Sequence, residues 1–265
     1  MPSHVDLSLR QFTEAWRVMS ADAPDAVAVS GEDIQYVFSG LPIGFFNIAL
    51  VTAEDLPADA LGAIGQHACA FASGRDVPWM FIVTHEGLAP GVDANTVLEA
   101  CDLVPLMPLT GMLALDVEPA ASIPDGLTLS VPQDDAGCAS SIDINAVAYG
   151  MDLEASKSLL GKPAFWKNHV LVIGTAEGAP ASSTAVLSVD GYRYVALVAT
   201  DPAYQRRGFA DATMRHALEV AARTIGDQPT VLHATAAGRP VYERMGYEVI
   251  SNHTIFMEKR FLEGH

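Results

Sequence analysis

The sequence predicts an α/β (α+β) fold in which strands and helices alternate along 265 residues. Three observations lead to this prediction. Short apolar runs, bounded by glycine, proline and acidic residues, alternate with segments whose apolar residues recur at helical spacing. The stretch at residues 194–222 has the order strand, glycine-containing loop, helix, and a similar order recurs in the first half. The composition, 50% hydrophobic and 18% charged, is that of a globular protein with one large or two ordinary cores.

The first half begins with an amphipathic helix, because Leu9, Phe12 and Trp16 fall on one helical face. The turn residues at 30–33 lie between two apolar runs and predict a β-hairpin. Further strands are expected at residues 43–51, 79–84 and 109–117, and further helices at 57–71 and 95–101. A segment containing proline and alanine, residues 118–124, is the expected linker to the second half.

The second half continues the alternation. Strands are expected at residues 127–131, 170–176, 183–189 and 194–199, and helices at 134–149 and 153–160. Pro202 ends the strand at 194–199, because proline lacks the N–H that a sheet requires. A helix follows, with apolar residues at Met214, Leu218 and Ala221. The chain is expected to close with a strand at 231–235, a short helix ended by Gly246, and a strand at 247–257.

The loop between the strand at 194–199 and the next helix is suited to binding a pyrophosphate. It reads Gln205-Arg206-Arg207-Gly208-Phe209-Ala210. Backbone N–H groups at the start of a helix point toward an anion at the positive end of the helix dipole. Gly208 lets the backbone approach a phosphate closely, and the two arginines add positive charge. A plain turn glycine beside two solvated arginines is the alternative interpretation.

These residues are part of a longer pattern. The motif Q-x-x-G-x-A follows a strand, and downstream a second strand leads to a helix that ends Y-x-x-x-G-Y, at Tyr242 to Tyr247. This pattern resembles the GNAT superfamily of acyl-CoA-dependent N-acyltransferases, over about the last half of the chain. The resemblance implies transfer of an acetyl group from acetyl-CoA to a primary amine of a small molecule or a protein. It also implies a mixed, mostly antiparallel central sheet flanked by helices.

The resemblance assigns roles to individual residues. Backbone amides of the loop, in particular Arg206 to Ala210, would hold the CoA pyrophosphate. The strand end at Val198, Ala199 and Thr200 would pair with the pantetheine arm, as an added strand does. A backbone N–H near Val198 would polarise the thioester carbonyl, and Tyr242 would protonate the leaving thiolate. The family often has glycine where this chain has Ala210.

The two halves look like diverged copies. Residues 97–103 correspond to residues 241–247, so that Leu98 stands where Tyr242 stands. The turn that corresponds to the phosphate loop, residues 52–57, contains two carboxylates and a proline, which cannot cradle a pyrophosphate. We therefore expect a tandem arrangement, with a degenerate GNAT-like domain at residues 1–120 and the acyltransferase domain at residues 121–265. Chance similarity between short segments is the alternative.

Composition and motifs argue against several other functions. A net charge of −17 would repel nucleic acid, and it is compatible with a cationic amine substrate. Apolar runs of membrane-spanning length and a signal peptide pattern are both missing, so we expect a cytoplasmic protein. The scattered residues Cys69, Cys101 and Cys138 have no metal-site spacing. Serine-hydrolase, P-loop and Rossmann motifs are missing as well.

Some alternatives stay open at this stage. His169 and His233 could act as a base for the attacking amine, although a hydrogen-bonded neutral histidine is the more common state in a strand. Glu177 and Asp190 could accept a proton through water, or could simply be solvated turn residues. The alternative function is a non-catalytic acyl-CoA-binding sensor or structural partner. A homodimer is possible, and the sequence does not specify the amine acceptor.

Overall fold

The structure, a computed structural model, describes residues 3–262 and divides into two compact units. The first unit contains the chain up to Met112, Ala234–Arg239 and the chain from Val249 onward. The second unit contains Leu113–His233 and Pro240–Glu248. The last strand of the chain therefore belongs mainly to the first unit. The expected boundary between residues 120 and 121 stays a prediction about where the two copies meet.

The first unit has a mixed sheet with the strand order β1-β2-β3-β4-β11-β5. Its strands are β1 Val27–Ser30, β2 Ile34–Phe38, β3 Asn47–Val51, β4 Met80–Thr84, β5 Leu103–Ala114 and β11 Glu248–Glu258. Its helices are α1 His4–Ser20, α2 Ala58–Ala72 and α3 Ala94–Glu99, with short 3-10 helices at Gly44–Phe46, His85–Gly87 and Lys259–Phe261. The pairs β1–β2, β2–β3 and β4–β11 are antiparallel, and β3–β4 is parallel.

Helices cover both faces of this sheet. Leu61 of α2 and Leu98 of α3 pack with Phe81 and Phe256 in one buried cluster. Successive side chains of a strand alternate between the two faces of its sheet. The odd-numbered residues of β11 therefore lie on the face opposite Phe256 and point toward α1. The hydroxyl groups of Ser8 and Ser251 lie 2.6 Å apart there.

A buried histidine continues this contact. His253 Nε2 lies 2.7 Å from the Ser251 hydroxyl group, and its Nδ1 lies 2.9 Å from the Thr84 hydroxyl group. All three residues are buried. Burial lowers the pKa of His253 to about 4; Glu86 partly opposes this shift and His85 adds to it. The imidazole is therefore neutral at physiological pH and links α1, β4 and β11 by hydrogen bonds.

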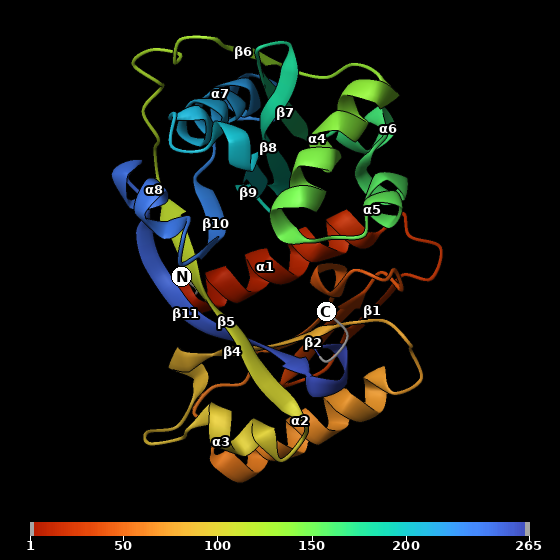
Figure 1. Ribbon diagram of the computed structural model, residues 1–265. Coiled ribbons are helices and arrows are strands. Elements are labelled where there is room, and N and C mark those ends of the chain that lie inside the picture. Colours follow the sequence, from red (N-terminus) through yellow and green to blue (C-terminus); the bar gives the residue numbers. More distant parts are fainter. Residues whose placement is uncertain (1–2, 263–265) are drawn as a thin grey trace. The chain divides into compact units, whose positions relative to one another are not determined.

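The second unit has the strand order β10-β9-β8-β7-β6 (Figure 1). Its strands are β6 Leu127–Ser130, β7 Val170–Ala176, β8 Ala179–Val189, β9 Tyr192–Thr200 and β10 Thr230–Thr235. Its helices are α4 Asp135–Tyr149, α5 Leu153–Leu160, α6 Pro163–Trp166, α7 Phe209–Thr224 and α8 Arg239–Arg244, with a 3-10 helix at Pro202–Tyr204. The pair β9–β10 is parallel, and the pairs among β6, β7, β8 and β9 are antiparallel.

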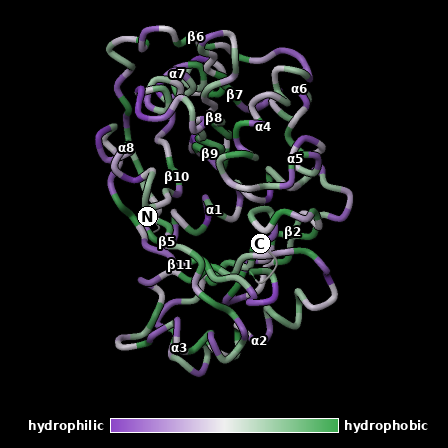
Figure 2. Tube along the Cα trace, in the orientation of Figure 1, coloured by the Kyte–Doolittle hydropathy of each residue, from purple (hydrophilic) through white to green (hydrophobic). Residues whose placement is uncertain are grey.

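Helices α4 and α7 lie on opposite faces of this sheet (Figure 1). Two successive residues of β8 show the alternation. Ser182 contacts Thr213 of α7, with 2.6 Å between their hydroxyl groups, whereas Ser183 accepts a hydrogen bond from Asn145 of α4 at 2.8 Å. Hydrophobic residues follow strands β7, β8 and β9 (Figure 2), which form the interior of this unit.

The predicted fold class is confirmed, because each unit has a mixed, mostly antiparallel sheet flanked by helices. The order β1-β2-β3-α2-β4 also repeats as β7-β8-β9-α7-β10, with the same sequence of antiparallel and parallel pairs. Among the residues that the structure describes, none of the helices combines the length and hydrophobicity needed to cross a membrane.

Some element boundaries differ from the sequence-based ones. The third strand begins at Asn47 instead of residue 43, because residues 44–46 form a 3-10 turn. Strand β8 begins at Ala179, four residues earlier than expected, because Glu177 and Gly178 close a two-residue hairpin with φ of 56° and 81°. Helix α6 was not predicted, although Pro163 at its first position is a local start signal.

Candidate active site

The loop after β9 is held by local hydrogen bonds. The carboxylate of Asp201 accepts a hydrogen bond from the N–H of Ala203 at 2.8 Å, which starts the 3-10 turn. The side-chain amide of Gln205 donates to the carbonyl oxygen of Thr200 at 3.4 Å. Arg206 and Gly208 have positive φ angles of 61° and 79°, and α7 then begins at Phe209. Gly208 fits this conformation without strain, since it lacks a Cβ atom.

Backbone N–H groups at the start of α7 are available to form hydrogen bonds. The N–H groups of Gly208, Phe209 and Ala210 donate to no other residue within the described range. Helix geometry leaves the first N–H groups without a partner in the helix, and they carry the positive end of the helix dipole. Three successive N–H groups at this position are suited to an anion such as a phosphate.

The two loop arginines differ in their surroundings. Arg207 forms an ion pair with Glu177 at 3.2 Å, and its guanidinium group lies 4.7 Å from the ring centroid of Phe209. Its side chain is thus held against its own loop. Arg206 is exposed, and it forms an ion pair with none of the described residues. Arg206 is therefore the loop arginine whose charge is more available to a bound anion.

Strand β9 contains a bulge directly before this loop. Ser183 of β8 is opposite Ala199 and Ala185 is opposite Ala196, so Leu197 and Val198 together face a single residue of β8. Leu197 has a φ of 51°, a backbone conformation that residues other than glycine and asparagine rarely adopt. Strain of this kind persists only where the surroundings enforce it, and it is often found at functional sites.

The bulge coincides with the point where β9 separates from its neighbour. The parallel pairing of β9 with β10 ends at Val195 and Leu232. Beyond Val195 the edge of β9 is therefore not paired with β10. Backbone groups of such an edge can bind an extended ligand as an additional strand. The side chain of Ala199 packs with Ile144 and Ile173, so this residue would contribute through its backbone.

A short chain of hydrogen bonds fixes the peptide group in the bulge. The side-chain amide of Asn145 donates to the Ser183 hydroxyl oxygen at 2.8 Å, and that hydroxyl group donates to the Leu197 carbonyl oxygen at 3.4 Å. Asn145 and Ser183 are fully buried. The Leu197 carbonyl and the Val198 N–H belong to one planar trans peptide and point in opposite directions. The two side chains therefore set the direction of the Val198 N–H.

Tyr149, at the end of α4, is a residue that the sequence reasoning missed. Its hydroxyl group donates a hydrogen bond to the Val198 carbonyl oxygen at 2.6 Å. The residue is 48% exposed, but protein surrounds its hydroxyl end, and this burial raises the pKa of Tyr149 to about 12. No local signal in the sequence joins residues 149 and 198, since their contact depends on the packing of α4 against the sheet.

Tyr242 lies on α8, and the end of that helix is well defined. The N–H of Tyr247 donates to the Tyr242 carbonyl oxygen at 3.1 Å and the N–H of Gly246 to that of Glu243 at 3.2 Å, the pattern of a Schellman motif. Burial raises the pKa of Tyr242 well above its usual value, and the neighbouring hydroxyl groups of Tyr149 and Tyr247 raise it further. Tyr242 therefore stays protonated at physiological pH and is able to donate a proton.

The other candidate bases have structural partners. His233 Nδ1 lies 2.8 Å from the Tyr194 hydroxyl group, and His169 Nδ1 accepts the N–H of Ser188 at 3.2 Å. Burial lowers the pKa of His169. Glu177 pairs with Arg207, as described above. Among the described residues, no group of histidine, cysteine, aspartate and glutamate side chains could hold a metal ion.

The loop suited to an anion lies at the end of β9, next to the bulge and the partly unpaired edge of that strand. This arrangement is suited to an extended ligand with a phosphate-bearing end. The family model described as "Acetyltransferase (GNAT) domain" matches residues 164–262, which include this region. Residues 164–262 therefore belong to the GNAT acetyltransferase family, whose chemistry is acyl transfer. No curated protein sequence matches the chain.

Solved structures extend the similarity in fold to nearly the whole chain. A GCN5-related N-acetyltransferase from Kribbella flavida is 17% identical with a TM-score of 0.72, covering 98% of this chain and 96% of that chain. Another from Sphaerobacter thermophilus is 15% identical with a TM-score of 0.59, covering 97% and 93%. A tandem GNAT protein from the clavulanic acid biosynthesis pathway is 13% identical with a TM-score of 0.55, covering 95% and 94%. The chain thus has the GNAT fold.

Proposed function

We propose that this protein is an N-acyltransferase that moves an acetyl group from acetyl-CoA to a primary amine of a small molecule or a protein. The observation that carries the proposal is the bulge in β9, where a strained leucine and two buried side chains hold one peptide group in a fixed direction. In the proposal, the loop N–H groups from Arg206 to Ala210 bind the pyrophosphate of the donor, and the backbone from Val198 to Thr200 binds its pantetheine arm.

The chemical step is a direct transfer. The amine nitrogen bonds to the thioester carbonyl carbon, the carbon–sulfur bond breaks, and the nitrogen loses a proton to solvent. The Val198 N–H stabilises negative charge that develops on the carbonyl oxygen, and Asn145 and Ser183 keep that N–H in place. Tyr242, whose hydroxyl group is kept protonated by burial, gives its proton to the departing sulfur, and the tyrosinate then takes up a proton from solvent.

The remaining expectations belong to the same proposal. The first copy, residues 1–120, does not bind CoA, because its turn at residues 52–57 lacks the chemistry of the phosphate loop. The protein acts in the cytoplasm, where acyl-CoA and amines meet, and a homodimer is one possible assembly. The amine acceptor is not specified, since the fold alone does not determine the substrate.

Two measurements, made one after the other, test the proposal. Calorimetric titration of the full chain with CoA and with acetyl-CoA should show saturable binding of both at one site. Release of free thiol from acetyl-CoA, followed for a panel of primary amines, should then increase with at least one of them. Binding without turnover by any amine would favour a non-catalytic acyl-CoA sensor, and the lack of any binding would reject the proposal.

A further inference from the structure

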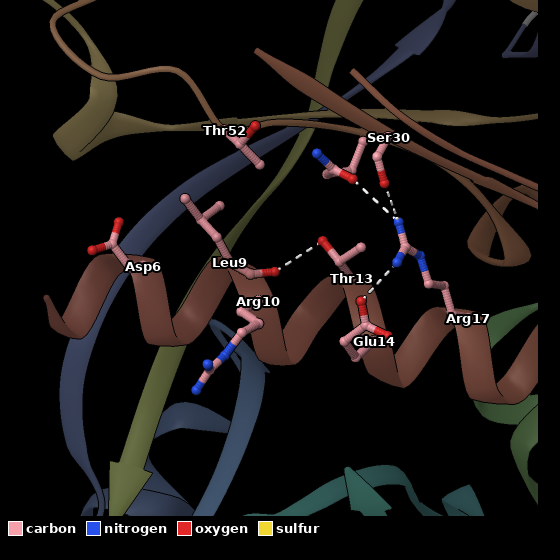
Figure 3. Close-up of a pocket in the computed structure, with 9 residues that line it drawn as sticks. Asp6, Leu9, Arg10, Thr13, Glu14, Arg17, Ser30 and Thr52 are labelled. Carbon is pink, nitrogen blue, oxygen red and sulfur yellow. Dashed lines mark hydrogen bonds and ion pairs between the residues drawn. The ribbon is translucent and has the colours of Figure 1, made fainter. Parts of the chain in front are cut away.

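The first unit has a cavity of about 440 Å³ between α1 and the hairpin of β1 and β2, and the charges of its lining balance. Arg17 Nη1 donates to the Glu14 carboxylate at 2.8 Å, and Arg17 Nη2 donates to the Ser30 hydroxyl oxygen at 2.7 Å (Figure 3). Asp6 and Arg10 add one charge of each sign. The lining therefore favours neither an anion nor a cation. A surface that points to one ligand lies in the second unit.

That surface belongs to the segment between β5 and β6, residues 115–126, which we call the strap. The strap runs along α7 (Figure 1), and two contacts trace its path. Arg215 of α7 donates a hydrogen bond to the Glu118 carbonyl oxygen. Further along the strap, Pro124 Cγ lies 3.6 Å from the position that a Cβ atom would take on Gly208. The strap therefore reaches the loop after β9, at the start of α7.

Both ends of the strap are held within the second unit. Near its start, the carbonyl oxygen of Asp116 lies 4.0 Å from the position that a Cβ atom would take on Gly246, at the end of α8. At its other end, the Leu127 N–H donates to the Pro124 carbonyl oxygen at 3.1 Å, and Leu127 packs with Phe209 of α7 in a buried cluster. Packing against α7 thus fixes Pro124 beside the loop.

Ile123 presents an apolar side chain at this place. The residue is 51% exposed, and Pro124 next to it is partly exposed. A single exposed isoleucine is common on protein surfaces and needs no explanation by itself. This one follows the strap to the point where Pro124 meets Gly208, so its apolar surface adjoins the N–H groups proposed to bind a pyrophosphate.

The charges around Ile123 favour an uncharged part of a ligand. The exposed carboxylates of the strap are Asp116, Glu118 and Asp125. Arg215, the arginine that contacts the strap, pairs with Asp211 at 3.0 Å. The strap would therefore repel a phosphate group, whereas the exposed Arg206 of the loop would attract one.

We propose that Ile123 and Pro124 bind the adenine base of CoA, an inference that rests on the proposed use of acetyl-CoA. In CoA a ribose joins the pyrophosphate to adenine, so the base stays within a few bond lengths of the loop. Adenine is planar and uncharged, and its faces can pack against aliphatic side chains. The strap lies outside residues 164–262, so the donor site extends beyond the part of the chain that the family model matches.

Methyl NMR of the full chain tests this contact directly. With the isoleucine methyl groups labelled and CoA at saturation, we expect nuclear Overhauser effects between the δ1 methyl group of Ile123 and the adenine protons H2 or H8. Ile123→Val lacks that methyl group, so the loss of its signal provides the assignment. Bound CoA whose adenine protons show no effect to Ile123 would overturn the proposal.

Calorimetry with two ligands locates the contact within the donor. CoA and 4′-phosphopantetheine share the pantetheine arm, but the second compound lacks the adenosine. Ile123→Ser should weaken CoA binding about fivefold, because apolar contact area is lost, and should leave 4′-phosphopantetheine binding unchanged. Leu115→Ser is the matched control, because Leu115 is 77% exposed at the other end of the strap, and it should bind CoA as the wild type does.

The outcomes separate the strap from the rest of the donor site. Unchanged CoA affinity in Ile123→Ser, or an equal loss of affinity for both ligands, would refute the adenine contact while leaving the loop assignment intact. Wild-type protein that binds neither ligand would instead refute the proposed acetyl-CoA site, and the adenine contact with it.

Discussion

The turn after β3 and the loop after β9 occupy equivalent places in the two units, and their chemistry differs. Each follows a strand that pairs in parallel with the strand after the next helix. The turn after β3 contains Glu54, Asp55 and Pro57, whereas the loop after β9 contains two arginines and Gly208. One therefore presents negative charge and a residue without an N–H where the other presents positive charge and three available N–H groups.

The amides of the first turn are also engaged within the unit. The N–H of Leu56 donates to the Gly87 carbonyl oxygen at 2.9 Å, and the N–H of Ala53 donates to that of Asp33 at 3.3 Å. The helix that follows begins after Pro57, which provides no side-chain cap. The comparison shows that the two units share a strand order, while one turn carries negative charge and the other carries positive charge and available N–H groups.

The strongest test of the comparison is Gly208→Glu. The substitution places a side chain at a φ of 79° and a negative charge beside the available N–H groups. We expect CoA affinity to fall at least about 100-fold, to below detection by calorimetry. Gly191→Glu is the matched control, because Gly191 has a φ of 80° in the turn before β9 and a Cβ atom added there would meet nothing within 4 Å. Normal CoA binding by Gly208→Glu would remove the basis for distinguishing the two loops.

Tyr242→Phe tests a second difference that the proposed alignment of the two halves predicts, in which Leu98 stands opposite Tyr242. Loss of the proton donor should reduce kcat about 100-fold, while the Kd for CoA stays within about twofold. Steady-state kinetics and calorimetry measure the two quantities. Tyr192→Phe, at the other end of β9, controls for removal of a tyrosine hydroxyl group. Full activity in Tyr242→Phe at every pH would exclude this residue from the mechanism.

A third prediction concerns the buried histidine of the first unit, which has no role in the proposed chemistry. The folded-state pKa of His253 is about 4, below its ordinary value of 6.5. As the pH falls below 6.5, the unfolded chain binds a proton that the folded chain does not, and stability is lost progressively toward pH 4. This group should therefore remove about 2 kcal/mol of stability between pH 7 and pH 4.5.

Urea denaturation at several pH values measures this loss. His253→Gln should be less stable at pH 7, because its hydrogen bonds change, but its stability should depend less on pH than that of the wild type. CoA affinity at pH 7 should be the same in both proteins. An identical pH dependence in both would mean that His253 is not kept neutral by the fold.

The smallest expected effect tests whether Ser183 orients the peptide group in the bulge of β9. Ser183→Ala breaks the contact with the Leu197 carbonyl, and we expect kcat to fall about 10-fold with an unchanged KM for acetyl-CoA. Ser183→Thr retains the hydroxyl group and should restore most of the rate. Ser182→Ala is the control, because it is the same substitution one residue away, on the face toward α7. Equal losses in both alanine variants would indicate a general packing effect.

Local signals in the sequence were sufficient for much of the fold. The turn residues at 30–33 identified the hairpin of β1 and β2, and helical spacing at Met214 and Leu218 identified α7. The loop could be found in the same way, because Gly208 and the start of the helix are adjacent in the chain. Such features depend on neighbours a few residues apart, which a single sequence displays.

Other features depend on contacts that the sequence does not display. The pairing of β11 with β4, such as His253 with Thr84, joins residues far apart in the chain, and apolar strands carry no sign of their partner. The positive φ of Leu197 could not be predicted, because leucine gives no signal for that conformation. The contact between Tyr149 and Val198 likewise spans 49 positions.

The pairing of β11 with β4 has a consequence for synthesis on the ribosome. Thr84 and His253 are 169 positions apart, so at typical elongation rates β4 waits roughly 10–30 s for its neighbouring strand. The buried cluster of the first unit is incomplete during that time, because Phe256 is among its members. The N-terminal half of this protein is therefore made first but can reach its final form only after translation has reached the last strand.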